Sequence, residues 1–252
     1  MRIFEVRLNY SSRFWLYAPI TIFLLIAVAV MVQWKFAADA FEKKLAALKG
    51  REAAPGIMLD WAGVTVGGFP FRLDADFTGF SIHGAGARGP FAWHSDKFAF
   101  HTLTYERSKA VYEAAGPQHL DWMAADGAHR VDFLPASLHA GSITDARGLR
   151  RFDMDIMGAS GRDFTAAELQ LHLRRNPDGK NVDVMVRGDR VAGHKQVQAY
   201  VTLTQASELM PLLAGIAPWP DAVTAWHGHG GEVRLDKGVE PDLAARALTA
   251  LY

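Results

Sequence analysis

The chain has 252 residues, a length that favours one globular domain with an additional segment. Its 27 Lys and Arg residues balance 27 Asp and Glu residues, and half of all residues are hydrophobic, which excludes disordered, collagen-like and polybasic nucleic-acid-binding chains. Cysteine is absent, so disulfides, Cys-ligated metal centres and thiol nucleophiles are excluded as well.

Charge is distributed unevenly along the chain. Residues 1–51 contain eight basic and three acidic residues, which leaves 19 basic and 24 acidic residues in the remainder. A mildly acidic domain is a poor match for phosphate backbones, so we expect no nucleic-acid partner.

The first predicted element is a transmembrane helix at residues 14–34, a stretch without formal charge. At 1.5 Å per residue such a helix is about 31 Å long, which matches the hydrocarbon core of a bilayer. Trp15, Tyr17 and Trp34 lie near its ends, where aromatic side chains favour the membrane interface.

A cleaved signal peptide is the alternative, because Ala38-Asp39-Ala40 resembles a cleavage site. The apolar run is longer than the ~7–15 residues of a signal-peptide core, which favours a retained single-pass anchor. The count of flanking basic residues opposes an N-inside orientation, yet a long following domain translocates largely regardless of charge. We therefore expect a cytoplasmic tail at 1–13 and the folded part on the other side of the membrane.

Helical spacing of apolar residues continues after the span and predicts a helical stalk at 35–52. Ala53-Ala54-Pro55-Gly56 interrupts this pattern, since proline disfavours helix in the residue before it. The remaining residues, 53–252, are predicted to form one antiparallel β-domain.

Alternation of apolar and polar residues dominates this part of the chain and predicts β-strands. The clearest alternating runs are at 71–77, 152–156, 169–173, 182–187 and 197–204, and further strands are expected near 57–66, 98–105, 119–123, 130–133, 137–143 and 232–236. Asn176-Pro177-Asp178-Gly179 is typical of a turn, so residues 167–187 are predicted to form a hairpin.

The predicted fold is mainly β: a curved antiparallel sheet, either a closed barrel or a partly open half-barrel, with a few short helices. Helical spacing returns only at 206–216 and 241–251, which is too little helix to cover the apolar face of the sheet. An open sheet near a membrane would present an apolar groove suited to acyl chains. The side chains expected to line either core or groove are Phe71, Leu73, Phe77, Phe98, Phe100, Leu169, Leu171, Leu173, Val184, Val186, Val201 and Leu203.

Three groups of residues are candidates for a catalytic or metal-binding site. Asp74 with Asp76, and Asp153 with Asp155, are carboxylate pairs on predicted strands, and they are interpreted as charges on the solvated face. His227 and His229, in a Gly-rich segment interpreted as a flexible turn, lack a third ligand for a metal. We therefore predict no catalytic site, no metal and no cofactor.

The string Gly67-Gly68-Phe69-Pro70-Phe71-Arg72, preceded by Trp61 and an N-terminal span, resembles an uncharacterised alphaproteobacterial membrane-anchored family, the domain-of-unknown-function family numbered twenty-one twenty-five. Trp226 and Gly230-Gly231 are similar to its closing region. The resemblance implies a β-rich periplasmic domain tethered to the inner membrane. The architecture is also distantly similar to AsmA-type envelope proteins, whose curved sheets carry lipids.

Two functions therefore remain open, and a third, an envelope hydrolase that uses His227 and His229, ranks below both. One is a non-catalytic periplasmic domain that binds a lipid or another apolar ligand. The other is a closed β scaffold that recruits an inner-membrane protein and binds no ligand.

Overall fold

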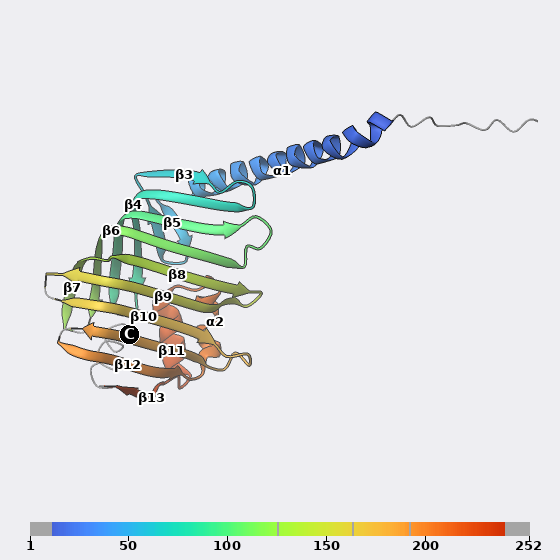
Figure 1. Ribbon diagram of the computed structural model, residues 1–252. Helices are drawn as coiled ribbons and strands as arrows, with labels where there is room; N and C mark the ends of the chain where they lie inside the picture. The colour runs from blue at the N-terminus through green and yellow to red at the C-terminus, as the bar shows by residue number, and fades with distance from the viewer. Residues whose placement is uncertain (1–11, 125, 163, 192, 240–252) are drawn as a thin grey trace, which may run out of the picture.

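In the computed structural model, the described residues are 12–124, 126–162, 164–191 and 193–239. A long helix, α1 (Ser12–Leu48), leads into a β-domain, as Figure 1 shows. The first strands are β1 Arg51–Ala54, β2 Ile57–Asp60, β3 Gly63–Gly67, β4 Arg72–Gly86, β5 Gly89–Leu103, β6 Lys109–Ala124 and β7 Gly127–Leu134. The later elements are β8 Ser137–Asp145, β9 Gly148–Gly161, β10 Thr165–Arg175, β11 Val182–Val191, β12 His194–Leu203, the 3-10 helix η1 Ala206–Leu209, α2 Met210–Leu213, α3 Trp219–Gly228 and β13 Val233–Val239.

All thirteen described strands belong to one antiparallel sheet. Its order is β1-β2-β4-β5-β6-β7-β9-β10-β11-β12-β13, with β3 paired to β4, and β8 paired to both β6 and β9. Ten of the thirteen pairs join strands that follow each other in the chain, and most of these are hairpins. The path does not close within the described residues, so the sheet is a partial ring and not a barrel.

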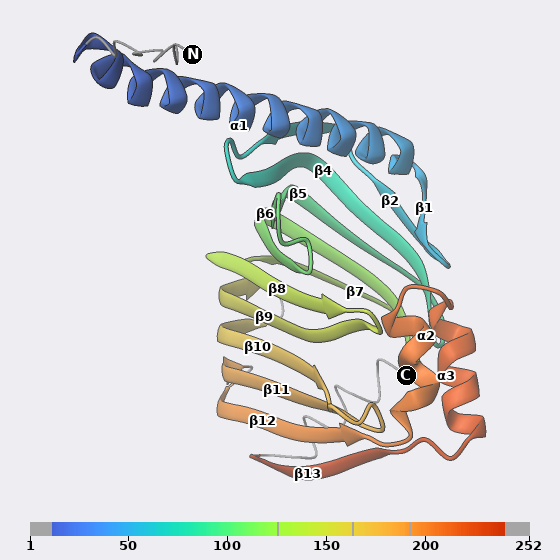
Figure 2. The same ribbon diagram turned by 90° about the vertical axis from the view of Figure 1, so that its right-hand side faces the viewer.

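The curvature comes from bends in the middle of the long strands. The first half of β6 pairs with β8 and its second half pairs with β7, and β4 divides in the same way between β3 and β2. Gly79, Asp96 and Gly116 fall out of the pairing in three neighbouring strands, and both glycines have positive φ, +58° and +79°. Such bulges bend a sheet sharply. Figure 2 shows the long strands sweeping from beneath α1 toward the short helices.

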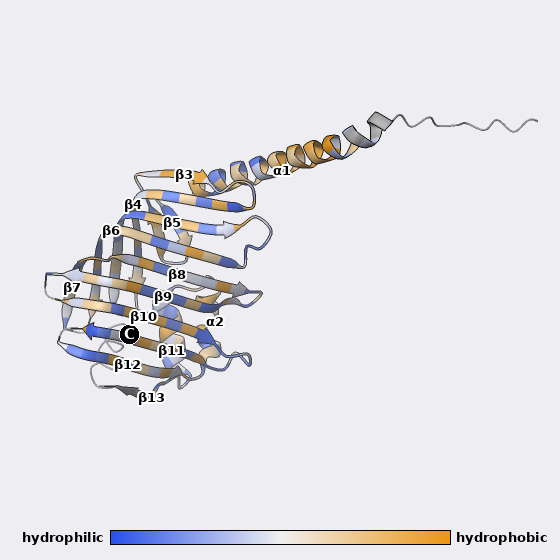
Figure 3. Ribbon diagram, viewed as in Figure 1, coloured by the Kyte–Doolittle hydropathy of each residue, from blue (hydrophilic) through white to orange (hydrophobic). Residues whose placement is uncertain are grey.

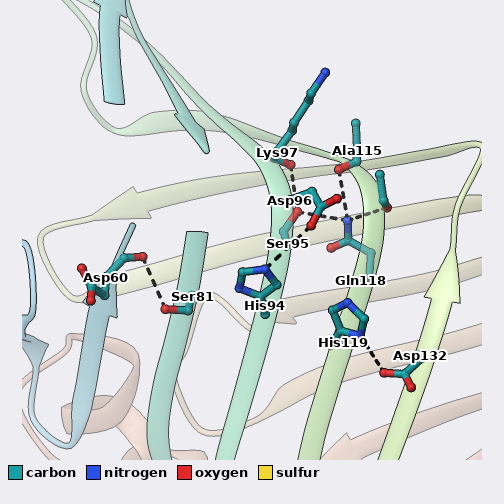
Figure 4. Close-up of polar contacts among 11 residues, drawn as sticks. Asp60, Ser81, His94, Ser95, Asp96, Lys97, Ala115, Gln118, His119 and Asp132 are labelled. Carbon is teal, nitrogen blue, oxygen red and sulfur yellow. Dashed lines mark hydrogen bonds and ion pairs between the residues drawn. The ribbon is translucent and has the colours of Figure 1, made fainter. Parts of the chain in front are cut away.

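A buried amide holds the bend between β5 and β6 together (Figure 4). Gln118 is fully buried, and its Nε2 donates to Ser95 Oγ and to the Gly116 carbonyl at 3.0 Å each. Ser95 Oγ donates in turn to the Lys97 carbonyl at 2.8 Å. These side chains therefore provide hydrogen-bond donors for backbone carbonyls at the bulge, where the pairing between β5 and β6 is interrupted.

Buried apolar side chains form three clusters along the sheet. One cluster, around Trp61 and Phe80, packs against the end of α1, and a second surrounds Ile156 in the middle of the sheet. Trp93 and Phe98 pack against both clusters, which joins them. A third cluster lies between β11, β12 and the short helices.

Helix α1 has two different halves. Its N-terminal half is apolar (Figure 3), and residues Tyr17–Leu48 form one helix long and hydrophobic enough to cross a membrane, none of whose most apolar window is buried. Its C-terminal half packs on the domain, where Ala38 and Leu45 are 2% and 8% exposed and the Phe41 ring lies 5.9 Å from the Phe100 ring.

The predicted fold class, a mainly β protein with one curved antiparallel sheet and an N-terminal apolar helix, is confirmed. The transition from helix to sheet differs in detail: the helix ends at Leu48 and β1 begins at Arg51, so the Pro55-Gly56 pair is the turn of the first hairpin. Residues 1–11 of the expected tail at 1–13 lie outside the described residues, and so does the whole of the expected helix at 241–251.

Candidate functional site

The short helices and one end of the sheet form the walls of a half-open apolar cavity of about 400 Å³. The strands contribute Leu173, Val182, Val184, Val201, Leu203 and Val233. The helical segment contributes Leu209, Leu212, Leu213, Trp219, Val223 and Trp226. The lining is almost entirely carbon, and the volume lies within the range of small-molecule sites.

The register of the sheet builds the strand wall of this cavity. Leu173, Val184 and Val201 lie opposite each other on β10, β11 and β12, and they form one apolar row across the sheet. Val182, Leu203 and Val233 form the next row. Because alternate residues of a strand share a face, the period-two pattern of the sequence places both rows on the same side.

The opposite wall depends on the orientation of Trp226 in α3. Its indole Nε1 donates to the Thr204 carbonyl at 2.6 Å, which satisfies its polar atom and leaves ring carbon facing the cavity. Gly231 lies so close to this ring that a Cβ at that position would overlap it. The bonded indole and the glycine together fix the tryptophan as part of the lining.

The helical segment also bridges distant parts of the sheet. The Trp219 ring lies 6.1 Å from the Phe91 ring of β5, and a Cβ on Gly148, at the turn between β8 and β9, would lie 2.5 Å from Ala214 Cα after α2. Contacts at Ala214 and Trp219 therefore hold the middle of the segment against β9 and β5. The segment forms one wall of the cavity and is called the lid below; Figure 2 shows its helices beside one end of the sheet.

The predicted apolar residues are distributed over the whole core. Leu173, Val184, Val201 and Leu203 line the cavity, and Leu171 and Val186 pack against the same cluster. Leu169 packs in the middle cluster, Phe77, Phe98 and Phe100 pack in the aromatic cluster near α1, and Leu73 is buried.

Phe71 differs from the expectation that it lies on the apolar face of a strand. It precedes β4 and is 57% exposed. The reason is local, because the turn around Pro70 delays the start of the strand to Arg72.

The lid contributes lining residues that the sequence analysis did not include among the expected apolar lining. Leu209, Leu212 and Leu213 lie in the predicted helical segment 206–216, although the structure divides it into η1 and α2. Helix α3 was not predicted, and the interpretation of its last residues as a flexible turn was wrong. The signal available was the pair of prolines at 218 and 220, which is typical of a helix start.

The carboxylates of the opposite face are partners in ion pairs. Arg72 Nη2 and His101 Nδ1 each lie 2.7 Å from a different oxygen of Asp74, on adjacent strands. Burial raises the pKa of Asp74, but the hydrogen bonds from Arg72 and His101 outweigh it, so the pKa lies below its ordinary value. The expectation of a solvated Asp74 was wrong: it is 7% exposed, because the loop at Gly68 covers it, whereas Asp76 is exposed.

The same arrangement recurs on β9 and β10. Arg151 Nε and His172 Nδ1 each lie 2.6 Å from Asp153, and the balance of burial against these two hydrogen bonds lowers its pKa as well. Asp155 is half-buried. Both triads stabilise the outer face of the sheet.

His227 and His229 do not form a common site. They fall at the end of α3, where residues two apart point in different directions, and His229 Nδ1 lies 2.8 Å from the Ala225 carbonyl. Within the described residues, no group of three or more His, Asp or Glu side chains is placed to hold a metal.

Comparison with known proteins gives one match. A family model described as an uncharacterized protein conserved in bacteria (DUF2125) matches residues 34–247, most of the chain. This match confirms the resemblance to an uncharacterised family that the Gly67–Arg72 string indicated. No curated protein and no solved structure matches.

Proposed function

We propose a function for this chain, which belongs to the uncharacterised bacterial family DUF2125. It is an inner-membrane-anchored periplasmic domain that binds the acyl chain of a lipid and does not catalyse a reaction. The cavity beneath the helical lid is the observation that carries this proposal. The anchor places the site close to a source of acyl chains.

The contacts of α1 support a retained anchor over a cleaved signal peptide. The helix continues through Ala38-Asp39-Ala40, and Ala38 is itself buried. Trp34 Nε1 donates to the Arg72 carbonyl at 2.9 Å, so cleavage after Ala40 would remove packing partners of the folded domain. A short basic N-terminal tail followed by a long domain supports the periplasmic side for the β-domain.

The chemistry of the cavity supports an acyl chain as the ligand. An apolar cavity of this size stays dry or takes an apolar guest, because water needs polar partners that these walls do not offer. Each buried methylene contributes about 0.8 kcal/mol to binding before the entropy of immobilisation is subtracted. A segment of hydrocarbon is therefore the guest that the lining favours.

Photocrosslinking in vesicles tests this assignment with the full chain. The chain is reconstituted with phosphatidylethanolamine carrying a diazirine on one acyl chain, and adducts are mapped by mass spectrometry after irradiation. We expect adducts on peptides from β11, β12 and the helical lid, in addition to the span at 14–34. Adducts confined to the span would refute acyl-chain binding and favour the scaffold without a ligand.

Paired variants make the test specific. In Val184→Phe/Val201→Phe the new rings fill the cavity, so the cavity adducts should disappear while those of the span remain. Met185→Phe is the matched control, because Met185 follows Val184 on β11 and points to the other face. Loss of adducts in the control would show that the effect does not arise in the cavity.

A further inference from the structure

Three aromatic side chains are exposed at the edge of the β-domain that adjoins α1. Phe69 is 53% exposed, Phe71 57% and Tyr105 73%. They belong to two loops, 68–71 before β4 and 104–108 between β5 and β6. Exposed aromatic residues gathered at one edge indicate a contact surface rather than the scattered exposure of an ordinary protein surface.

Direct contacts tie the 68–71 loop to the helix, and hydrogen bonds tie the 104–108 loop to the 68–71 loop. The Phe69 ring meets the Trp34 ring edge-on with centroids 5.6 Å apart, and Trp34 also bonds the Arg72 carbonyl. The Phe71 carbonyl accepts hydrogen bonds from the Thr104 backbone N–H at 2.9 Å and from its hydroxyl at 3.1 Å. The loops therefore hold a fixed position beside Trp34.

Trp34 sets the level of this surface relative to a bilayer. It is the last residue of the uncharged stretch 14–34, and Lys35 follows it. Tryptophan at such a position marks the boundary between hydrocarbon and headgroups, where amphipathic rings are most stable. The 68–71 loop contacts Trp34 and therefore lies at the same depth, and the 104–108 loop is bonded to it through Phe71 and Thr104.

The loops also carry charged side chains, and the acidic one between Tyr105 and Arg107, Glu106, is paired with Lys109 at 2.9 Å. Arg107 is exposed between Tyr105 and β6, and the guanidinium of Arg72 remains largely exposed although it pairs with Asp74. Basic side chains flanking aromatic residues favour a surface of anionic lipids.

We propose that Phe69, Phe71 and Tyr105 insert into the headgroup region of the bilayer that holds α1, so that the β-domain rests on the membrane instead of extending freely from it. This inference depends on the proposed anchoring. It adds a second membrane contact to the span and places one edge of the β-sheet against the lipid surface.

Fluorescence quenching at single cysteines tests the contact in the full chain, because the native sequence has no cysteine to remove. An environment-sensitive label (NBD) is placed at Leu24→Cys in the span, at Arg107→Cys in the loop, or at Ile216→Cys. Ile216 is the control, since it is 72% exposed and lies in the connection from α2 to α3, away from α1 (Figure 2). The vesicles contain phosphatidylcholine and phosphatidylglycerol, with a nitroxide quencher either on the headgroup or within the acyl chain.

We expect the headgroup quencher to reduce emission at position 107 by about twofold or more relative to position 216, as a label at the interface requires. The triple variant Phe69→Ser/Phe71→Ser/Tyr105→Ser should reduce quenching at 107 to the level at 216, with an unchanged near-UV circular dichroism spectrum. Quenching at 24 by the acyl-chain nitroxide without quenching at 107 would overturn the docking and leave the anchor intact. Absence of quenching at 24 would instead refute the anchoring itself.

Discussion

Filling the cavity with Val184→Phe should stabilise the protein. Phenylalanine adds four carbon atoms to the side chain, and at about 0.8 kcal/mol per buried carbon their burial contributes up to ~3 kcal/mol. Loss of rotamer freedom subtracts roughly 0.5–1 kcal/mol, and imperfect contact with the walls subtracts more. We expect a net gain of about 1 kcal/mol in the free energy of unfolding, the size seen for cavity-filling substitutions. In a core without free space the same change would be destabilising by about 1–3 kcal/mol.

The assay is thermal unfolding of the delipidated full chain in detergent, followed by near-UV circular dichroism. Removing lipid from both proteins matters, because a bound ligand would stabilise the wild type alone. A gain of 1 kcal/mol should raise Tm by about 2–4 °C for a domain of this size. Met185→Phe should change Tm little, since it alters the opposite face. A lower Tm for Val184→Phe with an unchanged control would refute the description of a dry cavity with room for a ring.

Three further substitutions test other features of the fold. Asp74→Asn should destabilise by about 1–3 kcal/mol in urea denaturation, whereas the exposed Asp76→Asn should stay within about 0.5 kcal/mol. Because the fold lowers the pKa of Asp74 below 3.8, its contribution to stability is present above that pH and is lost as pH falls through the pKa of the folded state. The free energy of unfolding of the wild type should therefore fall more steeply with decreasing pH than that of Asp74→Asn. Parallel curves would contradict this expectation. Gly148→Ala (φ +95°) should lower the free energy of unfolding by about 1–3 kcal/mol more than Gly127→Ala (φ +130°). Both changes strain the backbone, but only Gly148→Ala also makes a steric clash with the lid. Equal losses of stability would contradict the close contact between Gly148 and the lid. Gln118→Leu should destabilise by roughly 1–3 kcal/mol, since it leaves polar groups of the bend without a partner, and a neutral effect in the same denaturation assay would refute its role there.

The strands were predictable because one face of the sheet is apolar along its whole length. Alternation at 169–173 and 182–187 reflects this burial directly, and the turn at 176–179 fixes the hairpin between them. The same alternation correctly placed Leu173 and Val184 on the apolar side, where they line the cavity.

Other features depend on contacts that a linear pattern does not contain. The alternating pattern assigns Asp74 to the solvent-exposed face of the sheet. It is buried because the loop at Gly68 folds back over it and because the strand register places His101 opposite it. Helix α3 is short and ends among glycines, so its helical character depends on packing Trp226 against the sheet. The bends in β4 and β6 interrupt pairing at Gly79 and at Gly116-Pro117, which resemble ordinary strand interruptions in the sequence.

Helix α1 is continuous from its apolar half to its contacts with the domain, and no glycine or proline interrupts it between Gln33 and Leu48. In the proposed anchored arrangement, it is a rigid connection between the bilayer and the sheet. Transmembrane helices tilt when the hydrocarbon thickness changes, and a stiff arm passes that tilt on to whatever is fixed to it. In that arrangement, a change in bilayer thickness would act on the span and on the loops that rest on the membrane together, which makes lipid composition a determinant of how this domain is presented.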